Sequence, residues 1–434
     1  MRILHISTRL ILGGSQENTV LSCEGQARLG HEVHLAFGPI FGPEGSLLAR
    51  VEAFNQRCQS NKEHTTTAEP CTPIGIHVVP NLCRELSPRK DLRAFRELKR
   101  LIEQLQPDIV HTHSSKAGVL GRAAAWSVLA RNAHAHRAPR ASEGTLCPAI
   151  IHTIHGPPFM PIEGNPLTRT KIRLKNHLYT LAERFAARRC HTITSVADAM
   201  TEQFLARNIG TPAQYITVRS GMETKPFLVP RPGEDRATVR NQLGLAESDF
   251  VIGTVARLAE HKGHDDILDA LGNDLRDHPN WKLLWIGDGW WGDRLRARAA
   301  SMGLTNQLIT TGLVPNDRVP AMLRAMDILV HPSSREGLPR TVPQALLTGV
   351  TPIAYDADGT REMCRTNQTG ILVPVGDRNT LRAAVVQLHD DPDLRLRLAA
   401  TGRAECAREF TAERMVQHLE EVYANALHTI HPDH

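Results

Sequence analysis

The chain has 434 residues, of which 41% are hydrophobic and 22% charged, a balance typical of a globular protein. A single hydrophobic core stops growing at about 250–300 residues, so the length predicts two domains. The formal net charge of +5 suits an anionic small ligand or an acidic membrane surface and argues against a nucleic-acid partner.

Cysteine usage and apolar runs bear on the compartment. The eight cysteines form no CxxC pair, which predicts a reduced cytosolic chain rather than a disulfide framework. The apolar start reaches Gly13 and Gly14 too early for a secretory signal, and no apolar run approaches the ~18 residues that span a bilayer. We therefore expect a cytoplasmic protein, either dissolved or held peripherally at the inner face of the cytoplasmic membrane.

The first half of the chain alternates short apolar strands with helical patterns. A helical pattern covers residues 15–29, and two polar insertions, 56–73 and 132–148, are expected to form surface loops. The expected strands are 2–7, 31–38, 108–113 and 149–156. This alternation predicts a parallel sheet wound by helical crossovers.

The second half repeats this organisation after a Pro-rich, charged linker at residues 222–236. The expected strands are 250–258, 281–289, 307–312, 327–332, 351–356 and 370–375. We therefore predict two doubly wound, Rossmann-like α/β domains, residues 1–222 and 223–408, with a ligand cleft between them. Residues 409–434 are expected to form a C-terminal helix that returns toward the first domain.

Polar residues follow several of these strands. His113, His155, Arg257, Asp288 and Glu336 lie at or just after predicted strand ends. Small-molecule sites in parallel sheets lie outside the carboxyl ends of the strands, so these residues predict one shared site. The alternative is that strand-end loops are commonly polar, which would explain most of these residues singly.

Two short motifs admit a second interpretation. GDGWWG (287–292) matches the dinucleotide fingerprint G-x-G-x-x-G, but the next strand lacks the expected acid, so a tight strand-to-helix turn is favoured. DAD (356–358) resembles an Asp-x-Asp metal clamp, although a three-residue match is common by chance.

A histidine pair and a basic helix also allow alternatives. His111 and His113 share one face of a strand, as zinc ligands might, but no third ligand follows at suitable spacing, so side chains lining the cleft are favoured. The helix expected over residues 90–105 combines an apolar stripe with basic residues. It is either an ordinary surface helix packed on its own sheet or a basic face apposed to anionic lipid.

An ordered series of motifs resembles the retaining glycosyltransferases of family 4. The second half carries GTVARLAEHKG, WIGDG, TGLV, HPSSREGLPRTVPQALLTG and GILVPVGD, similar to the family's donor domain. In the first half, LGGSQENTV, HTHSSKAGVLGR and IHTIHGPPF are similar to its acceptor domain. The resemblance covers nearly the whole chain and implies the GT-B fold of two facing Rossmann-like domains.

The resemblance implies roles for individual residues. Arg257 and Lys262 match the family's diphosphate-binding pair, assisted by the helix terminus near Thr341. His155 matches the active-site histidine that contacts the donor sugar, and Glu336 matches the first acid of the Glu-x7-Glu motif, which binds sugar hydroxyls. The remaining expected donor-binding residues are Gly13, Gly14, Gly337 and Leu338, with Leu313 and Val314 near the base. Solvated cations and a strand-end histidine are the structural alternatives.

The chain departs from the family at Gln344, where the second acid would bind ribose hydroxyls. An amide oxygen still accepts from a hydroxyl, but without the charge-assisted bond. Thr341 and Gln344 also have the spacing of a helix capping box, which would compete for the same side chain.

These observations predict a retaining hexosyltransferase of polysaccharide or glycolipid assembly. It would move a hexose or hexosamine from a nucleotide diphosphate sugar to a hydroxyl of a glycan or lipid-linked acceptor. A UDP-sugar is the favoured donor and GDP-mannose the alternative. No metal or other cofactor is expected, because cations and a helix terminus would hold the diphosphate. A nucleotide-sugar 2-epimerase of the same fold and a non-catalytic nucleotide-sugar-binding protein are the alternatives.

Overall fold

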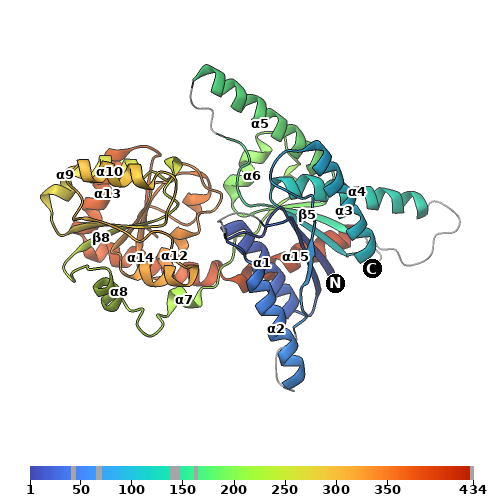
Figure 1. Ribbon diagram of the computed structural model, residues 1–434, viewed down its shortest axis with the longest axis horizontal. Helices are drawn as coiled ribbons and strands as arrows, with labels where there is room; N and C mark the ends of the chain where they lie inside the picture. Colours follow the sequence, from blue (N-terminus) through green and yellow to red (C-terminus); the bar gives the residue numbers. More distant parts are fainter. Residues whose placement is uncertain (41–44, 65–70, 137–146, 161–164, 431–434) are drawn as a thin grey trace. The chain divides into compact units, whose positions relative to one another are not determined.

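The computed structural model describes residues 1–40, 45–64, 71–136, 147–160 and 165–430. The chain divides into two compact units, each built on one parallel sheet (Figure 1). Unit 1 comprises Met1–Met222 together with the segment that begins at Ala412, and unit 2 comprises Glu223–Thr411. The predicted α/β class with two Rossmann-like sheets is confirmed.

Unit 1 contains a seven-stranded sheet with the order β3-β2-β1-β4-β5-β6-β7, in which every pair is parallel. The strands are β1 (Arg2–Ser7), β2 (Glu32–Phe37), β3 (Gly75–Val78), β4 (Ile109–His113), β5 (Ala149–Ile154), β6 (Thr192–Ser195) and β7 (Tyr215–Thr217). Strands β4 and β5 are buried along their whole length. Helices cover both faces of such a sheet, so the polar residues near the ends of β4 and β5 are buried as well.

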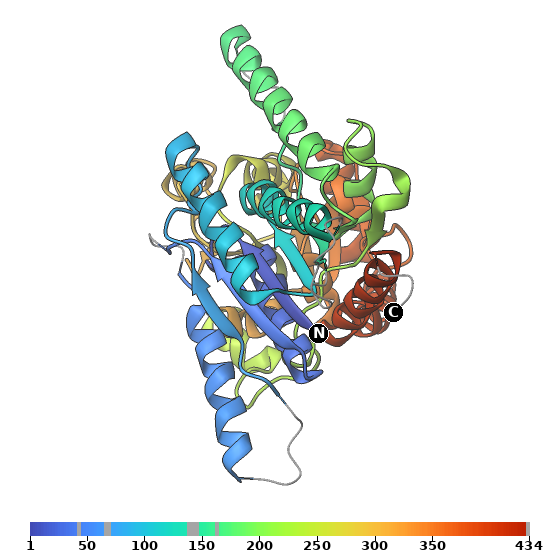
Figure 2. The same cartoon turned by 90° about the vertical axis from the view of Figure 1, so that its right-hand side faces the viewer.

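Two groups of helices surround this sheet. Helix α1 packs against α2 and α15, while α3, α4 and α5 pack side by side in chain order. The helices are α1 (Gly14–Arg28), α2 (Leu48–His64), α3 (Pro88–Leu105), α4 (Ser115–His136), α5 (Pro166–Ala187), α6 (Asp198–Leu205), η1 (Pro212–Gln214) and α15 (Ala412–Ile430). Figure 2 shows α5 extending away from the sheet that its own C-terminal end reaches.

Helix α15 is an integral part of unit 1, although it comes from the far end of the chain. Its buried side chains join those of β1, β4 and β5 in one hydrophobic cluster. A Cβ at Gly25 of α1 would lie 2.4 Å from the side chain of Val416. The glycine therefore allows α1 and α15 to pack closely.

Unit 2 contains a six-stranded parallel sheet with the order β10-β9-β8-β11-β12-β13. The strands are β8 (Phe250–Val255), β9 (Trp281–Ile286), β10 (Leu308–Thr310), β11 (Ile328–His331), β12 (Thr351–Tyr355) and β13 (Ile371–Val373). The helices are α7 (Lys225–Leu228), α8 (Arg236–Gln242), η2 (Glu260–Lys262), α9 (His264–Asp277), α10 (Gly292–Ser301), η3 (Asn316–Arg318), α11 (Val319–Arg324), α12 (Thr341–Leu347), η4 (Asp358–Glu362), α13 (Arg378–Asp390) and α14 (Pro392–Glu409). Trp281 and Trp285 of β9 are fully buried in its core.

Two of the expected surface loops are partly helical. Helix α2 continues to His64 and α4 continues to His136, so the prediction of loops at 56–73 and 132–148 is wrong for those parts. Residues 65–70 and 137–146 lie outside the described residues. In α2, the polar residues Gln56, Arg57, Gln59 and Ser60 are exposed, and an exposed helical face needs no apolar stripe.

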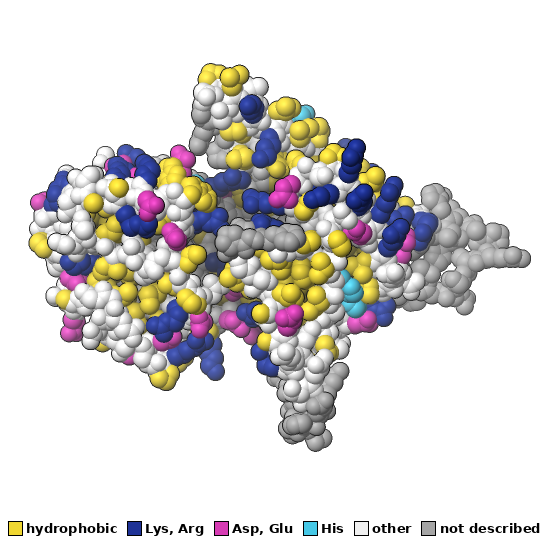
Figure 3. Space-filling view, viewed as in Figure 1, with side chains coloured by type: hydrophobic (Ala, Val, Ile, Leu, Met, Phe, Trp, Pro, Cys, Tyr) yellow, Lys and Arg dark blue, Asp and Glu magenta, His cyan; other side chains and the backbone are white. Residues whose placement is uncertain are grey.

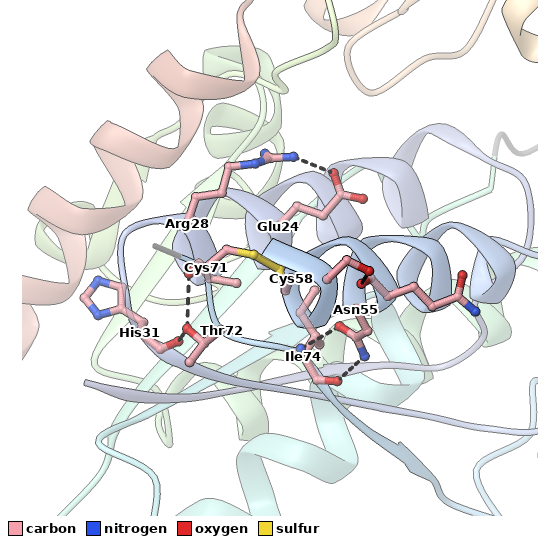
Figure 4. Close-up of a disulfide and its surroundings, with 11 residues drawn as sticks. Glu24, Arg28, His31, Asn55, Cys58, Cys71, Thr72 and Ile74 are labelled. Carbon is pink, nitrogen blue, oxygen red and sulfur yellow. Dashed lines mark hydrogen bonds and ion pairs between the residues drawn. A yellow bond between two sulfur atoms is a disulfide. The ribbon is translucent and has the colours of Figure 1, made fainter. Parts of the chain in front are cut away.

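The prediction of a chain without disulfides is also wrong. Cys58 near the end of α2 and Cys71 before β3 form a disulfide across a sequence separation of 13 residues (Figure 4). Next to it, Asn55 and Ile74 exchange two hydrogen bonds of 2.8 and 2.7 Å. A CxxC search misses this bond, because it depends on how α2 and β3 pack rather than on short spacing.

Within the described ranges, no helix combines the length and the apolar character that crossing a bilayer requires.

Candidate active site

Glu336 lies in the turn between β11 and α12, at the carboxyl edge of the sheet of unit 2. Its Oε1 accepts hydrogen bonds from Lys262 Nζ at 2.5 Å and from His331 Nε2 at 3.1 Å. Only 15% of the Glu336 side chain and 18% of the Lys262 side chain are exposed. The predicted sugar-binding acid and one of the two predicted cations therefore form a shielded ion pair.

Gly263 lets the Lys262 loop approach the end of β11. Its φ is +71°, and a Cβ there would lie 2.1 Å from the carbonyl oxygen of Pro332. Any larger residue would force the two loops apart. The backbone N–H of Ser334 also donates to the carbonyl of His261 at 2.9 Å, which ties the same loops together.

The DAD motif supports the Glu336 turn from its other side. Asp358 Oδ2 accepts from the backbone N–H of Glu336 at 2.7 Å, whereas Asp356 pairs with both ends of the Arg361 guanidinium at 2.9 Å. The two carboxylates therefore serve different partners. Asp358 adopts a positive φ of 48°, a conformation that Asp tolerates better than most residues.

The surroundings of Glu336 keep it ionised. Burial alone would raise its pKa, but the hydrogen bond from His331 and the charge of Lys262 outweigh burial and hold the pKa well below the ordinary value of 4.5. Because an ionised carboxylate only accepts, His331 Nε2 is the donor. The other nitrogen of His331, Nδ1, lies 3.2 Å from the Thr341 hydroxyl.

This last contact overturns the predicted capping box. The N-cap of α12 is Arg340, so Thr341 is already helical and its hydroxyl bonds to His331 instead of to the helix backbone. Gln344 is the fourth residue of the helix and is half-buried. Its side-chain amide makes no hydrogen bond among the described residues, so helix capping does not occupy it.

Arg257 stands in the loop that follows β8. The side chain is exposed, and its guanidinium carbon lies 5.7 Å from the centre of the Trp290 ring. Trp290 belongs to the GDGWWG turn, whose Gly289 packs so closely that a Cβ would lie 2.3 Å from the carbonyl oxygen of Leu258. Gly289 thus allows close packing between two strand-end loops, in agreement with the interpretation of GDGWWG as a tight strand-to-helix turn.

Leu313 and Val314 follow β10, at the same edge of the sheet. Leu313 is 79% exposed and Val314 is half-buried. Gly337 and Leu338 lie in the Glu336 turn, and the Gly337 carbonyl accepts from Gly359 N–H at 3.1 Å. Every predicted donor-binding residue of unit 2 except Gln344 therefore sits in a loop, or for Lys262 in the short helix η2, that follows the carboxyl end of a strand.

In unit 1, His155 ends a chain of histidines that runs into the core. His155 Nε2 lies 3.1 Å from His113 Nδ1, His113 Nε2 lies 2.9 Å from His5 Nδ1, and His5 Nε2 lies 2.8 Å from Gln26 Oε1. Gln26 Oε1 can only accept, so His5 donates to it from Nε2. Each neutral ring then accepts at Nδ1, which makes His155 the donor to His113.

Burial favours this neutral form. It lowers the pKa of His5 to about 4, and burial together with the neighbouring histidines lowers the pKa of His111 and His113 well below the ordinary value.

Gly13 and Gly14, the two predicted glycines of this unit, form the N-cap and first residue of α1.

The histidine cluster includes the third potential metal ligand that local spacing did not reveal. Nitrogens of His5, His111 and His113 lie within 4.8 Å of one another. Each ring nitrogen of the three already has a hydrogen-bond partner, because His111 contacts Tyr423 at 2.6 Å and Thr153 at 2.7 Å. Hydrogen bonding alone therefore accounts for the cluster.

Sequence reasoning missed His331, His5 and Gln26, and it considered Asp358 only as part of a possible metal clamp. His331 and His5 could have been noticed as polar residues inside apolar strands, which is costly without a partner. The contact of Asp358 with Glu336 and that of Gln26 with His5 have no local signal, because the partners are 22 and 21 residues apart.

Family models match both units. Residues 13–221 match the glycosyl transferase 4-like domain, and residues 235–405 match the glycosyl transferases group 1. The chain belongs to the group 1 glycosyltransferases. The family resemblance of the motif series is thereby confirmed, as is the prediction of a hexosyltransferase with the GT-B fold.

Individual relatives of this glycosyltransferase support the same family assignment. The chain is 27% identical over 349 residues to the UDP-Gal:alpha-D-GlcNAc-diphosphoundecaprenol alpha-1,3-galactosyltransferase of Escherichia coli, covering 80% of this chain and 82% of that protein. It is 30% identical over 239 residues to the 2-deoxystreptamine glucosyltransferase of Streptomyces kanamyceticus, covering 55% and 61%. The chain is a nucleotide-sugar-dependent hexosyltransferase of polysaccharide or glycolipid biosynthesis.

The fold agrees with solved structures. Anabaena HepE in complex with UDP superposes with a TM-score of 0.71 at 19% identity, covering 98% of this chain and 100% of that one. At this identity the likeness concerns the fold.

Proposed function

We propose that this glycosyltransferase moves a hexose or hexosamine from a UDP-sugar to an acceptor hydroxyl and retains the anomeric configuration. The observation that carries the proposal is the Glu336 carboxylate, held ionised by Lys262 and His331 at the carboxyl edge of the sheet of unit 2. The E. coli relative is named for a UDP-sugar donor and an alpha-linked product, which supports both the nucleotide and the stereochemistry. GDP-mannose is the alternative donor.

Residues 223–408 would form the donor domain. Lys262 and Arg257 would bind the diphosphate, which requires Lys262 to exchange part of its contact with Glu336 for a phosphate oxygen. Glu336 would then accept hydrogen bonds from sugar hydroxyls. Leu313 and Val314 would contact the base, and Gly337 and Leu338 would offer backbone donors beside the diphosphate.

Gln344 would bind the ribose. Its amide is half-buried and has no other partner among the described residues, so its oxygen can accept from a ribose hydroxyl. The second acid of the family motif is thus replaced by a neutral acceptor in the same helix.

Residues 1–222, completed by the returning helix in 409–434, would form the acceptor side. Gly13 and Gly14 would permit close approach of the backbone to the donor. His155 would contact the transferred sugar, and the chain from Gln26 through His5 and His113 would fix which of its nitrogens carries the proton.

The proposed chemistry is a same-face displacement. The bond between the sugar C1 and the diphosphate oxygen breaks, and a bond between C1 and the acceptor oxygen forms on the same side. The acceptor proton passes to the departing phosphate oxygen. The protein contributes positioning and charge stabilisation, and the cations Arg257 and Lys262 make a metal or other cofactor dispensable.

The acceptor would be a glycan or a lipid-linked sugar, since the E. coli relative is named for a diphosphoundecaprenol acceptor. A place at the inner face of the cytoplasmic membrane follows from such an acceptor. Basic residues of α3 would contribute long-range attraction to anionic lipid. The apolar residues Ala94, Leu98 and Ile102 of α3 are buried and Leu92 is its one large exposed apolar side chain among the described residues, so residues 90–105 offer mainly charge.

Calorimetric titration with UDP, GDP and ADP tests the donor assignment, with Arg257→Ala as the matched variant. We expect UDP to bind most tightly and the variant to lose ten- to a hundredfold in affinity, because about 1.5–3 kcal/mol of charge-assisted bonding is removed. Preference for GDP would replace the base assignment. Transfer to an acceptor with inversion at C1, read from the product's coupling constants, would refute the mechanism.

A further inference from the structure

Helix α5 (Pro166–Ala187) presents an uncovered apolar stripe. The stripe consists of five exposed side chains: Leu167, Leu174, Leu178, Leu181 and Phe185. Successive members are separated by seven, four, three and four residues. At 100° per residue this spacing places all five within one narrow sector of the helix.

Most of α5 has little contact with its own unit. Its C-terminal end is anchored by the buried Ala186 and Ala187 and by the buried ion pair between Glu183 and Arg122. Toward the N-terminus, the Asn176 amide hydrogen-bonds to the backbone of Met160, and the leucines on either side of it stay exposed. Figures 1 and 2 show the helix projecting from unit 1 as an arm.

Basic residues accompany the stripe. Lys171 and Lys175 lie on one flank of the apolar sector and Arg188, just after the helix, on the other. The single acid of α5 is Glu183, which is neutralised by Arg122. Figure 3 shows hydrophobic and basic side chains together along the α5 arm.

A pocket opens at the base of the helix. It has a volume of about 470 Å³ and combines apolar with basic walls: Trp126, Leu181, Arg184, Phe185, Arg188 and Arg189. The Arg189 guanidinium lies 3.6 Å from the centre of the Phe185 ring, where it extends the apolar stripe with a fixed positive charge. Guanidinium groups beside an apolar wall suit a phosphate that is attached to a hydrocarbon chain.

We propose that α5 docks unit 1 on an anionic bilayer, with its apolar stripe in the acyl boundary and its basic flanks among the lipid phosphates. The inference rests on the proposed function in so far as a lipid-linked acceptor would reside on that membrane. The positive charge on both flanks of the stripe favours an anionic lipid surface over a second copy of the chain as the binding partner. Pairing two such stripes would bring basic flanks together, whereas an anionic surface complements them.

Co-sedimentation of the full chain with vesicles tests the proposal. The vesicles contain phosphatidylglycerol mixed with phosphatidylcholine, or phosphatidylcholine alone. We expect the wild type to bind the anionic vesicles, and Leu174→Gln with Leu178→Gln to weaken binding about a hundredfold, at about tenfold per leucine. Leu86→Gln with Leu396→Gln removes two exposed leucines elsewhere and should change binding less than about twofold.

A charge series compares α5 with α3. Lys171→Gln with Lys175→Gln should weaken binding more than tenfold, at about fivefold per charge close to the surface. Arg93→Gln with Arg96→Gln on α3 should have a smaller effect, because those charges adjoin a single exposed leucine, Leu92, rather than an apolar stripe.

Three results would overturn the inference. They are a wild type that ignores anionic vesicles at low salt, leucine variants that bind like wild type, and leucine variants that only turn a dimer into a monomer. Titration of the same proteins with UDP separates this inference from the proposed function. Retained UDP affinity with lost vesicle binding supports α5 docking, whereas a wild type that binds vesicles but no nucleotide would refute only the donor assignment.

Discussion

Glu336→Gln tests the ion pair at the centre of the candidate site. The substitution keeps the shape of the side chain and an oxygen that can accept from His331 and Lys262, but it removes the negative charge. Lys262 is then left as a shielded ammonium group whose partner is neutral. We expect three separable effects, on stability, on nucleotide affinity and on turnover.

The size of the stability effect follows from the burial of the pair. Removing one partner of a fully buried ion pair costs about 3–5 kcal/mol. Here 15% and 18% of the two side chains are exposed and the hydrogen bonds persist, so we expect about 2 kcal/mol. For a unit of this size, that loss lowers the Tm of unit 2 by about 4–8 °C.

The affinity for UDP should not fall with the stability of the variant. In wild type, a bound diphosphate must share Lys262 with Glu336 and also approaches the carboxylate charge. In Glu336→Gln, Lys262 is available to the phosphate, so UDP should bind as tightly as in wild type or more tightly. Turnover should still fall about a hundredfold, equivalent to ~2.7 kcal/mol, because the charge that binds sugar hydroxyls is lost.

The assays are thermal unfolding with and without saturating UDP, calorimetric titration with UDP, and steady-state kinetics. Saturating UDP should narrow the Tm difference between variant and wild type, since the diphosphate replaces the missing charge. Glu405→Gln is the matched control, because Glu405 of α14 pairs with Arg365 and neither residue belongs to the candidate site. It should leave turnover unchanged.

The pH dependence gives an independent reading of the same pair. The pKa of Glu336 is depressed in the folded protein, so its stabilisation is complete above about pH 4.5 and is lost as the pH falls below that value. The Tm difference between wild type and Glu336→Gln should therefore be constant at higher pH and shrink below it. A variant with wild-type Tm and turnover, or one that loses tenfold in UDP affinity, would refute this account of the pair.

Three further predictions concern other parts of the site. Gln344→Glu should keep turnover within about tenfold of wild type. Gln344→Ala should raise the donor KM more than it lowers kcat, because a ribose contact is the same in the ground state and the transition state. Steady-state kinetics of both variants with one donor test these expectations. Gln26→Leu should lower the free energy of unfolding by about 1–3 kcal/mol, because the buried Nε2 of His5 loses its acceptor. The same variant should have a lower kcat and an unchanged affinity for UDP. A kcat equal to that of wild type would contradict the proposed role of the histidine chain. Transfer should continue in excess EDTA, and complete loss that Mg²⁺ restores would show that the diphosphate needs a metal.

The fold was predictable where the physical signal is local. Strand β5 is buried along its whole length and four of its six residues are apolar, so its pattern shows directly in the sequence. Strands β6 and β7 have only four and three residues and were not predicted, because so few positions cannot establish a pattern. The disulfide between Cys58 and Cys71 was missed because it depends on tertiary packing.

The site was predictable only in part for the same reason. Glu336 was recognisable from its motif and from its place after a strand. Its pairing with Lys262 spans 74 residues and depends on the close packing at Gly263, which no local pattern encodes. The capping box at Thr341 failed because residue spacing does not specify where a helix begins, and here a buried histidine binds the hydroxyl.

The return of α15 to unit 1 has a consequence for synthesis on the ribosome. Unit 2 is one continuous segment, Glu223–Thr411, so it can complete its sheet while the rest of the chain is still being translated. Most of unit 1 is translated before unit 2 but must wait, because the side chains of α15 that cover β1, β4 and β5 are translated after unit 2. Until then the apolar face around Ile3, Ile109 and Ile151 is uncovered, and the buried His111 lacks the hydroxyl of Tyr423. The unit translated first is therefore the last to become native, and a nascent chain stalled before residue 412 would present that face to chaperones.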